Sequence, residues 1–102
     1  MASASHLLHV FIAGNSARSV SATETIERLC EKHMPGDYEL EIFDVLERPE
    51  DAAAAAILAT PTVVRRHPPP ELRLVGDLSD EQAVLAALRL GPHAAPEAGN
   101  GD

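Results

Sequence analysis

The hydrophobic and polar positions of the first half of the chain separate into three kinds of segment. Residues 6–13 are almost continuously apolar, which is typical of a strand covered on both faces. Residues 16–34 carry apolar positions three and four residues apart, which predicts a helix ended by the Pro-Gly pair at 35–36. Residues 38–42 alternate between apolar and acidic side chains, which indicates a second strand. The predicted apolar stripe of the helix comprises Val20, Thr23, Ile26, Leu29, Cys30 and His33 or Met34.

The second half of the chain predicts a short helix and two further strands. Pro49 suits the first turn of a helix that extends over residues 50–58, where five successive alanines favour helix. The β-branched run at 62–64 and Leu-Arg-Leu-Val at 72–75 are typical of strands. Three prolines at 68–70 predict a stiff, extended polyproline connection between them.

A turn and a helix follow the fourth strand. Gly76 supplies the turn, because glycine readily adopts backbone conformations that other residues avoid. Ser-Asp-Glu-Gln at residues 79–82 has the spacing of a capping box, so we expect Ser79 to open the last helix. Leucine and alanine continue the helical pattern to Leu90.

The predicted order is β-α-β-α-β-β-α, one α/β domain over residues 6–90. A βαβ crossover followed by a hairpin and a helix gives a mixed sheet with helices on both faces. Pro61 stands directly before the third strand, which completes the outline of a thioredoxin-like fold, and it is a candidate cis proline. We expect residues 1–5 to be flexible and residues 91–102, rich in Gly, Pro and Ala, to be a disordered tail.

Composition and charge argue against several classes of protein. A formal net charge of −8 argues against a nucleic-acid-binding protein, whose contact surface would be basic. Cys30 is the single cysteine, so an internal disulfide cannot form and a cytoplasmic setting is expected. The chain has no run of ~20 apolar residues that would span a membrane, and its start lacks the basic region of a signal peptide.

The pattern of reactive side chains predicts a protein that is not an enzyme. A thioredoxin-like oxidoreductase needs Cys-x-x-Cys at the start of its first helix, where this chain has Asn-Ser-Ala-Arg at 15–18. Cys30 lies near the other end of that helix and is predicted to be a buried, inert thiol. The histidines lack metal-ligand spacing; His6 and His9 should face opposite sides of their strand, at the surface or at strand ends. We expect no catalytic residue, metal or cofactor.

Arg65, Arg66 and Arg73 form the basic cluster of an acidic chain and bracket the proline run. Two interpretations stay open for them. They are solvated arginines on an edge strand, which protects such a strand from aggregation. Alternatively, they form a contact surface for an acidic partner, presented by the proline connection.

Several motifs in register give the chain a resemblance to the KaiB family of circadian-clock proteins. The resemblance covers residues 6–90, most of the chain. The motifs are Val-Phe-Ile-Ala-Gly-Asn at 10–15, Phe-Asp-Val-Leu at 43–46, Ile-Leu-Ala-Thr-Pro-Thr at 57–62, Pro-Pro-Pro at 68–70 and Gly-Asp-Leu-Ser at 76–79.

The resemblance implies a regulatory protein and a partner. KaiB-like proteins bind the N-terminal ATPase ring of KaiC, a hexameric ATPase, in a state that depends on nucleotide hydrolysis, and in the cyanobacterial clock the complex captures KaiA. Family members dock through the half of the molecule that here carries Arg65, Arg66 and Arg73, which the resemblance therefore implies as partner contacts. The family also switches between a thioredoxin-like form and a tetrameric form whose last segment is a strand, so self-association as a dimer or tetramer stays open.

Two departures from the family change these expectations. Ala87-Leu88-Arg89 stands where cyanobacterial members carry Gly-Leu-Asp. Alanine favours helix over glycine by ~1 kcal/mol, and an arginine suits a helix C-terminus, so we expect the thioredoxin-like form to dominate. Glu39 and Glu41 occupy a strand that is neutral or basic in those members, so we do not expect KaiA capture.

Two alternatives belong to other classes of protein. The first is a free-standing adaptor or sensory module that resembles the N-terminal domain of the histidine kinase SasA and acts in stress or signalling without an oscillator. The second is a glutathione-dependent transferase, which would need a catalytic residue at the first helix, where Ser16 stands. Ser16, Ser19 and Ser21 lack a nucleophile elbow, and we expect them to cap the helix instead.

Overall fold

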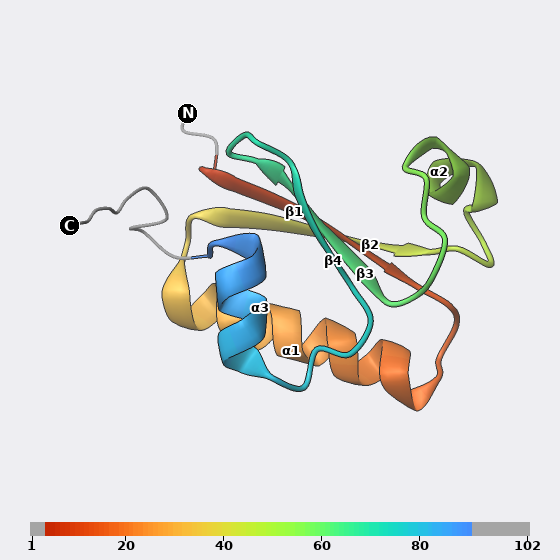
Figure 1. The fold of residues 1–102 in the computed structure, drawn as a ribbon, viewed down its shortest axis with the longest axis horizontal. Coiled ribbons are helices and arrows are strands. Elements are labelled where there is room, and N and C mark those ends of the chain that lie inside the picture. Colours follow the sequence, from red (N-terminus) through yellow and green to blue (C-terminus); the bar gives the residue numbers. More distant parts are fainter. Residues whose placement is uncertain (1–3, 91–102) are drawn as a thin grey trace.

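The computed structural model describes residues 4–90 and folds them into a four-stranded mixed sheet with three helices (Figure 1). The strand order is β2-β1-β3-β4, with β1 parallel to β2 and antiparallel to β3, and β3 antiparallel to β4. The elements are β1 (His6–Ile12), α1 (Ala17–His33), β2 (Tyr38–Asp44), α2 (Pro49–Ala54), β3 (Thr62–His67), β4 (Leu72–Val75) and α3 (Glu81–Leu88). This arrangement is the predicted thioredoxin-like fold.

The domain boundaries stay predictions. The predicted flexible segment 1–5 lies mostly outside the described residues, and the predicted disordered tail 91–102 lies entirely outside them.

The helices cover the two faces of the sheet unequally. Helices α1 and α3 lie together on one side, and α2 lies on the other side near one end of the strands (Figure 1). We call the side under α1 and α3 the core face and the opposite side the open face. The main buried cluster, between the core face and the two helices, comprises Leu8, Val10, Ala22, Ile26, Leu29, Cys30, Met34, Val63, Leu78, Val84 and Leu88. A smaller cluster on the open face comprises Phe11, Phe43, Ala55 and Val64.

Helix α1 is rotated relative to the predicted stripe. Ser16 is its N-cap, as predicted, and accepts a hydrogen bond from the Ser19 backbone N–H. Ser19 is buried and its hydroxyl donates to the Ala13 carbonyl, 3.3 Å away, so it is not a cap. A small polar side chain therefore occupies the position closest to the end of β1, and Val20 is turned outward with 46% of its surface exposed. The prediction of Val20 as core was wrong, and Ser21 is an exposed helical residue.

Two predicted connections differ in the structure. The helix expected over 50–58 ends at Ala54, because Ala56 has a positive φ of 56° that breaks the helical path. The proline run is not an extended polyproline segment: the His67–Pro68 and Pro69–Pro70 bonds are cis, and the run forms bends. Because β3 and β4 are antiparallel neighbours, the chain must reverse direction here, which a straight connection could not do.

The turn before α3 is glycine-dependent, and the start of α3 is one residue later than predicted. Gly76 has φ 102°, which L side chains rarely adopt, and its N–H donates to the Pro61 carbonyl over 2.9 Å. Asp80, not Ser79, caps α3 by accepting a hydrogen bond from the backbone of Ala83 over 3.1 Å. The Ser79 hydroxyl is held instead by Asp77, 3.0 Å away.

Candidate functional site

The structure places the three predicted arginines on different faces of the sheet. Arg65 is on the core face with 2% of its surface exposed. Its Nη2 donates to the Pro70 carbonyl over 3.0 Å and its Nη1 to the Arg89 carbonyl over 3.4 Å. Burial, and then the charge of Arg89, lowers the pKa of Arg65. Arg65 therefore ties the proline loop and the end of α3 to the sheet, and its prediction as part of an exposed cluster was wrong.

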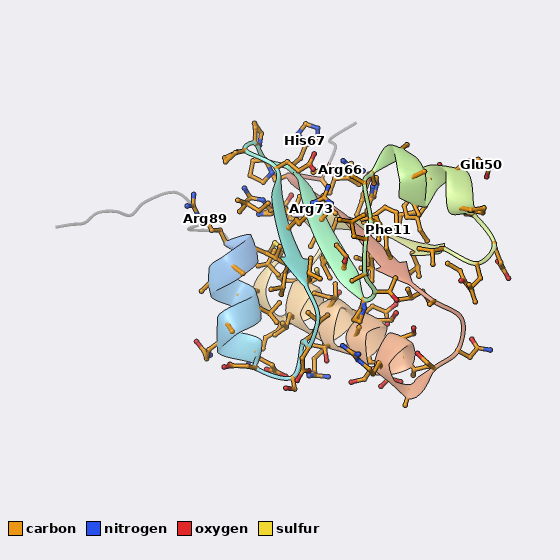
Figure 2. All side chains as sticks on the ribbon, turned by 45° about the vertical axis from the view of Figure 1, so that its right-hand side comes forward. Phe11, Glu50, Arg66, His67, Arg73 and Arg89 are labelled. Atoms are coloured by element: carbon orange, nitrogen blue, oxygen red, sulfur yellow. The ribbon has the colours of Figure 1, made fainter. Side chains whose placement is uncertain are left out.

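Arg66 and Arg73 come together on the open face, where they share one carboxylate (Figure 2). Arg66 Nη1 lies 3.0 Å from Glu71 Oε1, and Arg73 Nη2 lies 3.4 Å from Glu71 Oε2. The hydrogen bond from Arg66, and then that from Arg73, lowers the pKa of Glu71. We call Arg66 and Arg73 the arginine pair. Arg66 does not lie on an edge strand, as one of the two interpretations expected, because β3 lies between β1 and β4.

A histidine of β1 positions Arg66. Between Leu7 and Leu8 the pairing of β1 with β3 shifts, and this β-bulge leaves Arg66 without an opposite residue on β1. Arg66 Nε donates to His9 Nδ1 over 3.1 Å, which requires the neutral imidazole. Burial, and then the charge of Arg66, lowers the pKa of His9. The neutral state on which this contact depends is thereby favoured.

The C-terminal end of α2 positions Arg73. Its Nη2 donates to the Ala55 carbonyl over 2.9 Å and its Nη1 to the Ala56 carbonyl over 3.3 Å. Carbonyls at the end of a helix lack partners within the helix and carry its negative dipole, which suits a guanidinium. The sequence offered no signal for this contact, since an alanine run indicates only a helix.

Stacked aromatic rings form the base of the open face beside the arginine pair. The rings of Phe11 and Phe43 lie 4.8 Å apart and are nearly parallel. His9 contacts Phe43 at 4.9 Å between ring centroids, and the Arg48 guanidinium lies 4.3 Å from the Phe43 centroid. Glu41 Oε1 lies 3.8 Å from His9 Nε2, so a carboxylate, an imidazole and the Arg48 guanidinium surround the apolar rings.

The place of a thioredoxin active site carries no thiol in this chain. The Thr60–Pro61 bond is cis, and a hollow of about 180 Å³ lies between Pro61 and the first turns of α1. It is lined by Ala17, Arg18, Ser21, Ala22, Pro61, Asp77 and Leu78. Cys30 is fully buried elsewhere in α1, and burial, followed by the charges of Glu27 and Glu31, raises its pKa to about 12. This thiol is in no position to act as a thiolate nucleophile.

The other reactive side chains of the described segment have structural contacts. The Ser16 hydroxyl is engaged in capping and lies 3.0 Å from the Ser19 hydroxyl. His6 and His9 face opposite sides of β1 as predicted, and His6 lies at the end of the strand, where it is buried. Within residues 4–90 no three His, Cys, Asp or Glu side chains are grouped so that they could hold a metal ion. No helix of this part of the chain has the length and apolar character needed to cross a membrane.

The residues predicted to fix the last helix lie at its C-terminal end. Ala87 is exposed on α3. Arg89 forms the C-cap in a left-handed conformation (φ 51°), and its N–H donates to the Leu85 carbonyl. The Arg89 carbonyl is one of the two acceptors of Arg65. Figure 2 shows Arg89 at the end of α3, on a different element from Arg66 and Arg73.

Fold and site define a thioredoxin-like protein without the cysteine pair of a disulfide oxidoreductase. The chain belongs to the KaiB family: the profile described as the KaiB domain matches residues 9–90. It is 41% identical to circadian clock protein KaiB3 of Synechocystis sp. over 86 residues, 84% of each chain. It is 42% identical to circadian clock oscillator protein KaiB of Thermostichus vulcanus over 85 residues, 83% of this chain and 79% of the relative.

Solved structures agree on the fold. The N-terminal domain of Synechococcus elongatus SasA superposes with a TM-score of 0.69 at 20% identity, covering 84% of this chain and 82% of that domain. Mitochondrial thioredoxin 3 of Saccharomyces cerevisiae superposes with a TM-score of 0.67 at 18% identity, covering 84% and 78%. At these identities the likeness shows the fold alone.

Proposed function

We propose that this chain is a regulatory protein of the clock type that binds the N-terminal ATPase ring of a KaiC-type hexamer in a nucleotide-dependent way, and that it catalyses no reaction itself. The observation that carries the proposal is the match to the KaiB domain over residues 9–90, together with 41% identity to a clock protein. The buried, high-pKa Cys30 supports the absence of thiol chemistry.

The arginine pair is the proposed contact surface for this partner. Arg66 and Arg73 retain 30% and 33% of their side-chain surface, and both are already held in place by neighbouring groups. An arginine held in one rotamer loses less entropy when it binds, which favours affinity. Arg65 is assigned a different part: buried on the core face, it ties the proline loop and the end of α3 to the sheet and does not contact the partner.

Residues outside the arginine pair bear on the resting form of the protein and on a second partner. We propose that the protein rests in the thioredoxin-like form, with Ala87 and Arg89 favouring a helical α3, and that it forms at most weak tetramers. Glu39 and Glu41 give β2 two exposed carboxylates, so capture of KaiA is not part of the proposal. Amide-resolved NMR should give helical chemical shifts over residues 84–88; strand shifts there would contradict the proposed resting form.

Native mass spectrometry of the protein with a KaiC-type hexamer from the same source tests the proposed binding. With ATP we expect adducts of up to one copy per ATPase subunit, and with a non-hydrolysable analogue we expect few or none. Arg66→Glu combined with Arg73→Glu should remove the adducts. Arg18→Glu combined with Lys32→Glu makes the same change of charge at two exposed positions of α1 and should leave them. A folded protein without adducts in either nucleotide state would overturn the proposal.

The second candidate is a free-standing adaptor or sensory module. It is favoured by the superposition on the N-terminal domain of SasA, which is a fold match only. The same spectra distinguish the two functions, because an adaptor of this kind gives no hydrolysis-dependent adduct with the hexamer.

A further inference from the structure

Glu71 occupies the space between two guanidinium groups in the way that a bound carboxylate would. Each of its oxygens contacts a different arginine: Oε1 lies 3.0 Å from Arg66 Nη1 and Oε2 lies 3.4 Å from Arg73 Nη2. Arginine is the side chain best suited to hold a planar carboxylate with paired donors. The open face therefore contains a carboxylate site whose present occupant comes from the chain itself.

The arginine pair is positioned by groups other than Glu71. Arg66 Nε is bound to His9 Nδ1, and Arg73 is bound to the carbonyls of Ala55 and Ala56. Removing Glu71 would leave these contacts in place. The site is thus preorganised, and it does not need its internal carboxylate to keep its shape.

Glu71 itself is weakly held. It follows the proline loop directly, 44% of its side chain is exposed, and within the described residues its carboxylate is bound only by the arginine pair. Exposed ion pairs of this kind add little to stability, because solvent screens them and their side chains lose entropy. An external carboxylate can therefore replace Glu71 at small cost.

We propose that the arginine pair is a recognition site for an acidic side chain of a partner protein, and that Glu71 is a built-in competitor which the partner's carboxylate displaces. Once Glu71 moves away, the two guanidinium groups of the arginine pair are available to another carboxylate, in a chain whose net charge is −8. Arg48 is itself paired with Glu41 and Asp51. The identity of the partner rests on the proposed function, but the chemistry of the site does not. An aspartate or glutamate on a protein surface is the occupant, because the present occupant has the same group.

An NMR titration tests the site without any assumption about the hexamer. The probe is an acetylated, amidated hexaglutamate peptide, with the hexaglutamine peptide as its control. Hexaglutamate should shift the Nε–H signals of Arg66 and Arg73, and hexaglutamine should not. The Glu71→Gln variant should bind hexaglutamate about two- to fivefold more tightly than the wild type, the range expected from losing one exposed ion pair.

The matched control is Glu39→Gln. Glu39 is exposed on β2, also on the open face, and forms no ion pair within residues 4–90. Its loss changes the net charge equally without freeing an arginine, so this variant should bind like the wild type. Equal tightening in Glu71→Gln and Glu39→Gln would overturn the proposal, as would arginine signals that hexaglutamate does not shift.

The same two variants with the KaiC-type hexamer separate this inference from the proposed function. If the hexamer binds, Glu71→Gln should again exceed Glu39→Gln in affinity, and equality would contradict the competitor assignment. If the hexamer does not bind any variant, the proposed function fails, while the peptide titration still decides whether Glu71 competes for the arginine pair.

Discussion

On the core face of the sheet Arg65 is 2% exposed and binds two backbone carbonyls, whereas on the open face its neighbour Arg66 keeps 30% of its side chain exposed and binds a carboxylate. The two residues are adjacent in β3 and have the same side chain. Their surroundings differ because two helices, α1 and α3, pack along one face, while α2 covers only one end of the other (Figure 1). The comparison teaches that polar groups on the core face stabilise the fold, whereas partly exposed polar groups on the open face can bind a partner.

The largest difference is expected between two neighbouring leucines of β1. Leu8 is fully buried on the core face, and Leu7 is only partly buried on the open face. Leu8→Ala should lower the free energy of unfolding by about 3–4 kcal/mol, because it removes packed methyl groups and leaves a cavity, and Leu7→Ala by about 1 kcal/mol or less. Urea denaturation of both variants measures this. Similar losses would show that the open face is packed as fully as the core face.

The next difference is expected between the two adjacent arginines. Arg65→Ala leaves the carbonyls of Pro70 and Arg89 without their donor and opens a cavity, which should cost about 2–3 kcal/mol. Arg66→Ala removes a half-exposed ion pair and should cost about 1 kcal/mol or less. Arg65→Met keeps much of the packing and should fall between them. The order is read from the same denaturation curves, and a loss for Arg66→Ala that exceeds that for Arg65→Ala would contradict the assignment.

A smaller effect is expected from pH, through His9 on the open face. The pKa of His9 is lowered in the folded protein from its ordinary value of 6.5, so the unfolded chain takes up the proton first as pH falls. His9 therefore reduces the free energy of unfolding as pH falls below that ordinary value, and its contribution levels off below the lowered pKa. His9→Gln should flatten the decline measured by urea denaturation between about pH 7.5 and 5.5. An unchanged decline would contradict this account of the His9–Arg66 contact.

The smallest effect is expected at Cys30 in α1, where the native protein should show almost none. Its thiol is buried and its pKa is raised to about 12, so little thiolate is present at pH 8. Iodoacetamide should leave Cys30 unmodified in the folded protein and modify it after unfolding in urea, as followed by intact mass. Rapid modification of the native protein would show that the Cys30 thiol is accessible and reactive, and would contradict its assignment as a buried, inert thiol.

Much of the fold could be predicted from short sequence patterns. The alternation in β2, the position of Pro61 before β3 and the turn at Gly76 each depend on residues close in sequence, and they were found at the expected positions. The start of α3 was missed by one residue, because Ser79 and Asp80 are both suitable caps and only the tertiary turn with Asp77 decides between them.

The site was less predictable, since it depends on contacts between distant segments. The sequence marked Arg65, Arg66 and Arg73 as one cluster. In the structure Arg65 is buried and hydrogen-bonded to the carbonyl of Arg89, 24 residues further along the chain, a contact that no local pattern indicates. The role of Glu71 depends on a hairpin that reverses within the proline loop, where an extended connection was predicted.

The central claim, that recognition uses the open face and not the core face, is tested most directly by one matched pair of variants. Arg65→Met and Arg66→Met make the same substitution at adjacent positions on opposite faces. The affinity of each folded variant for the KaiC-type hexamer with ATP should be measured by biolayer interferometry. The account predicts that Arg66→Met weakens binding about tenfold and Arg65→Met by less than about twofold. Equal losses, or a larger loss for Arg65→Met, would contradict it.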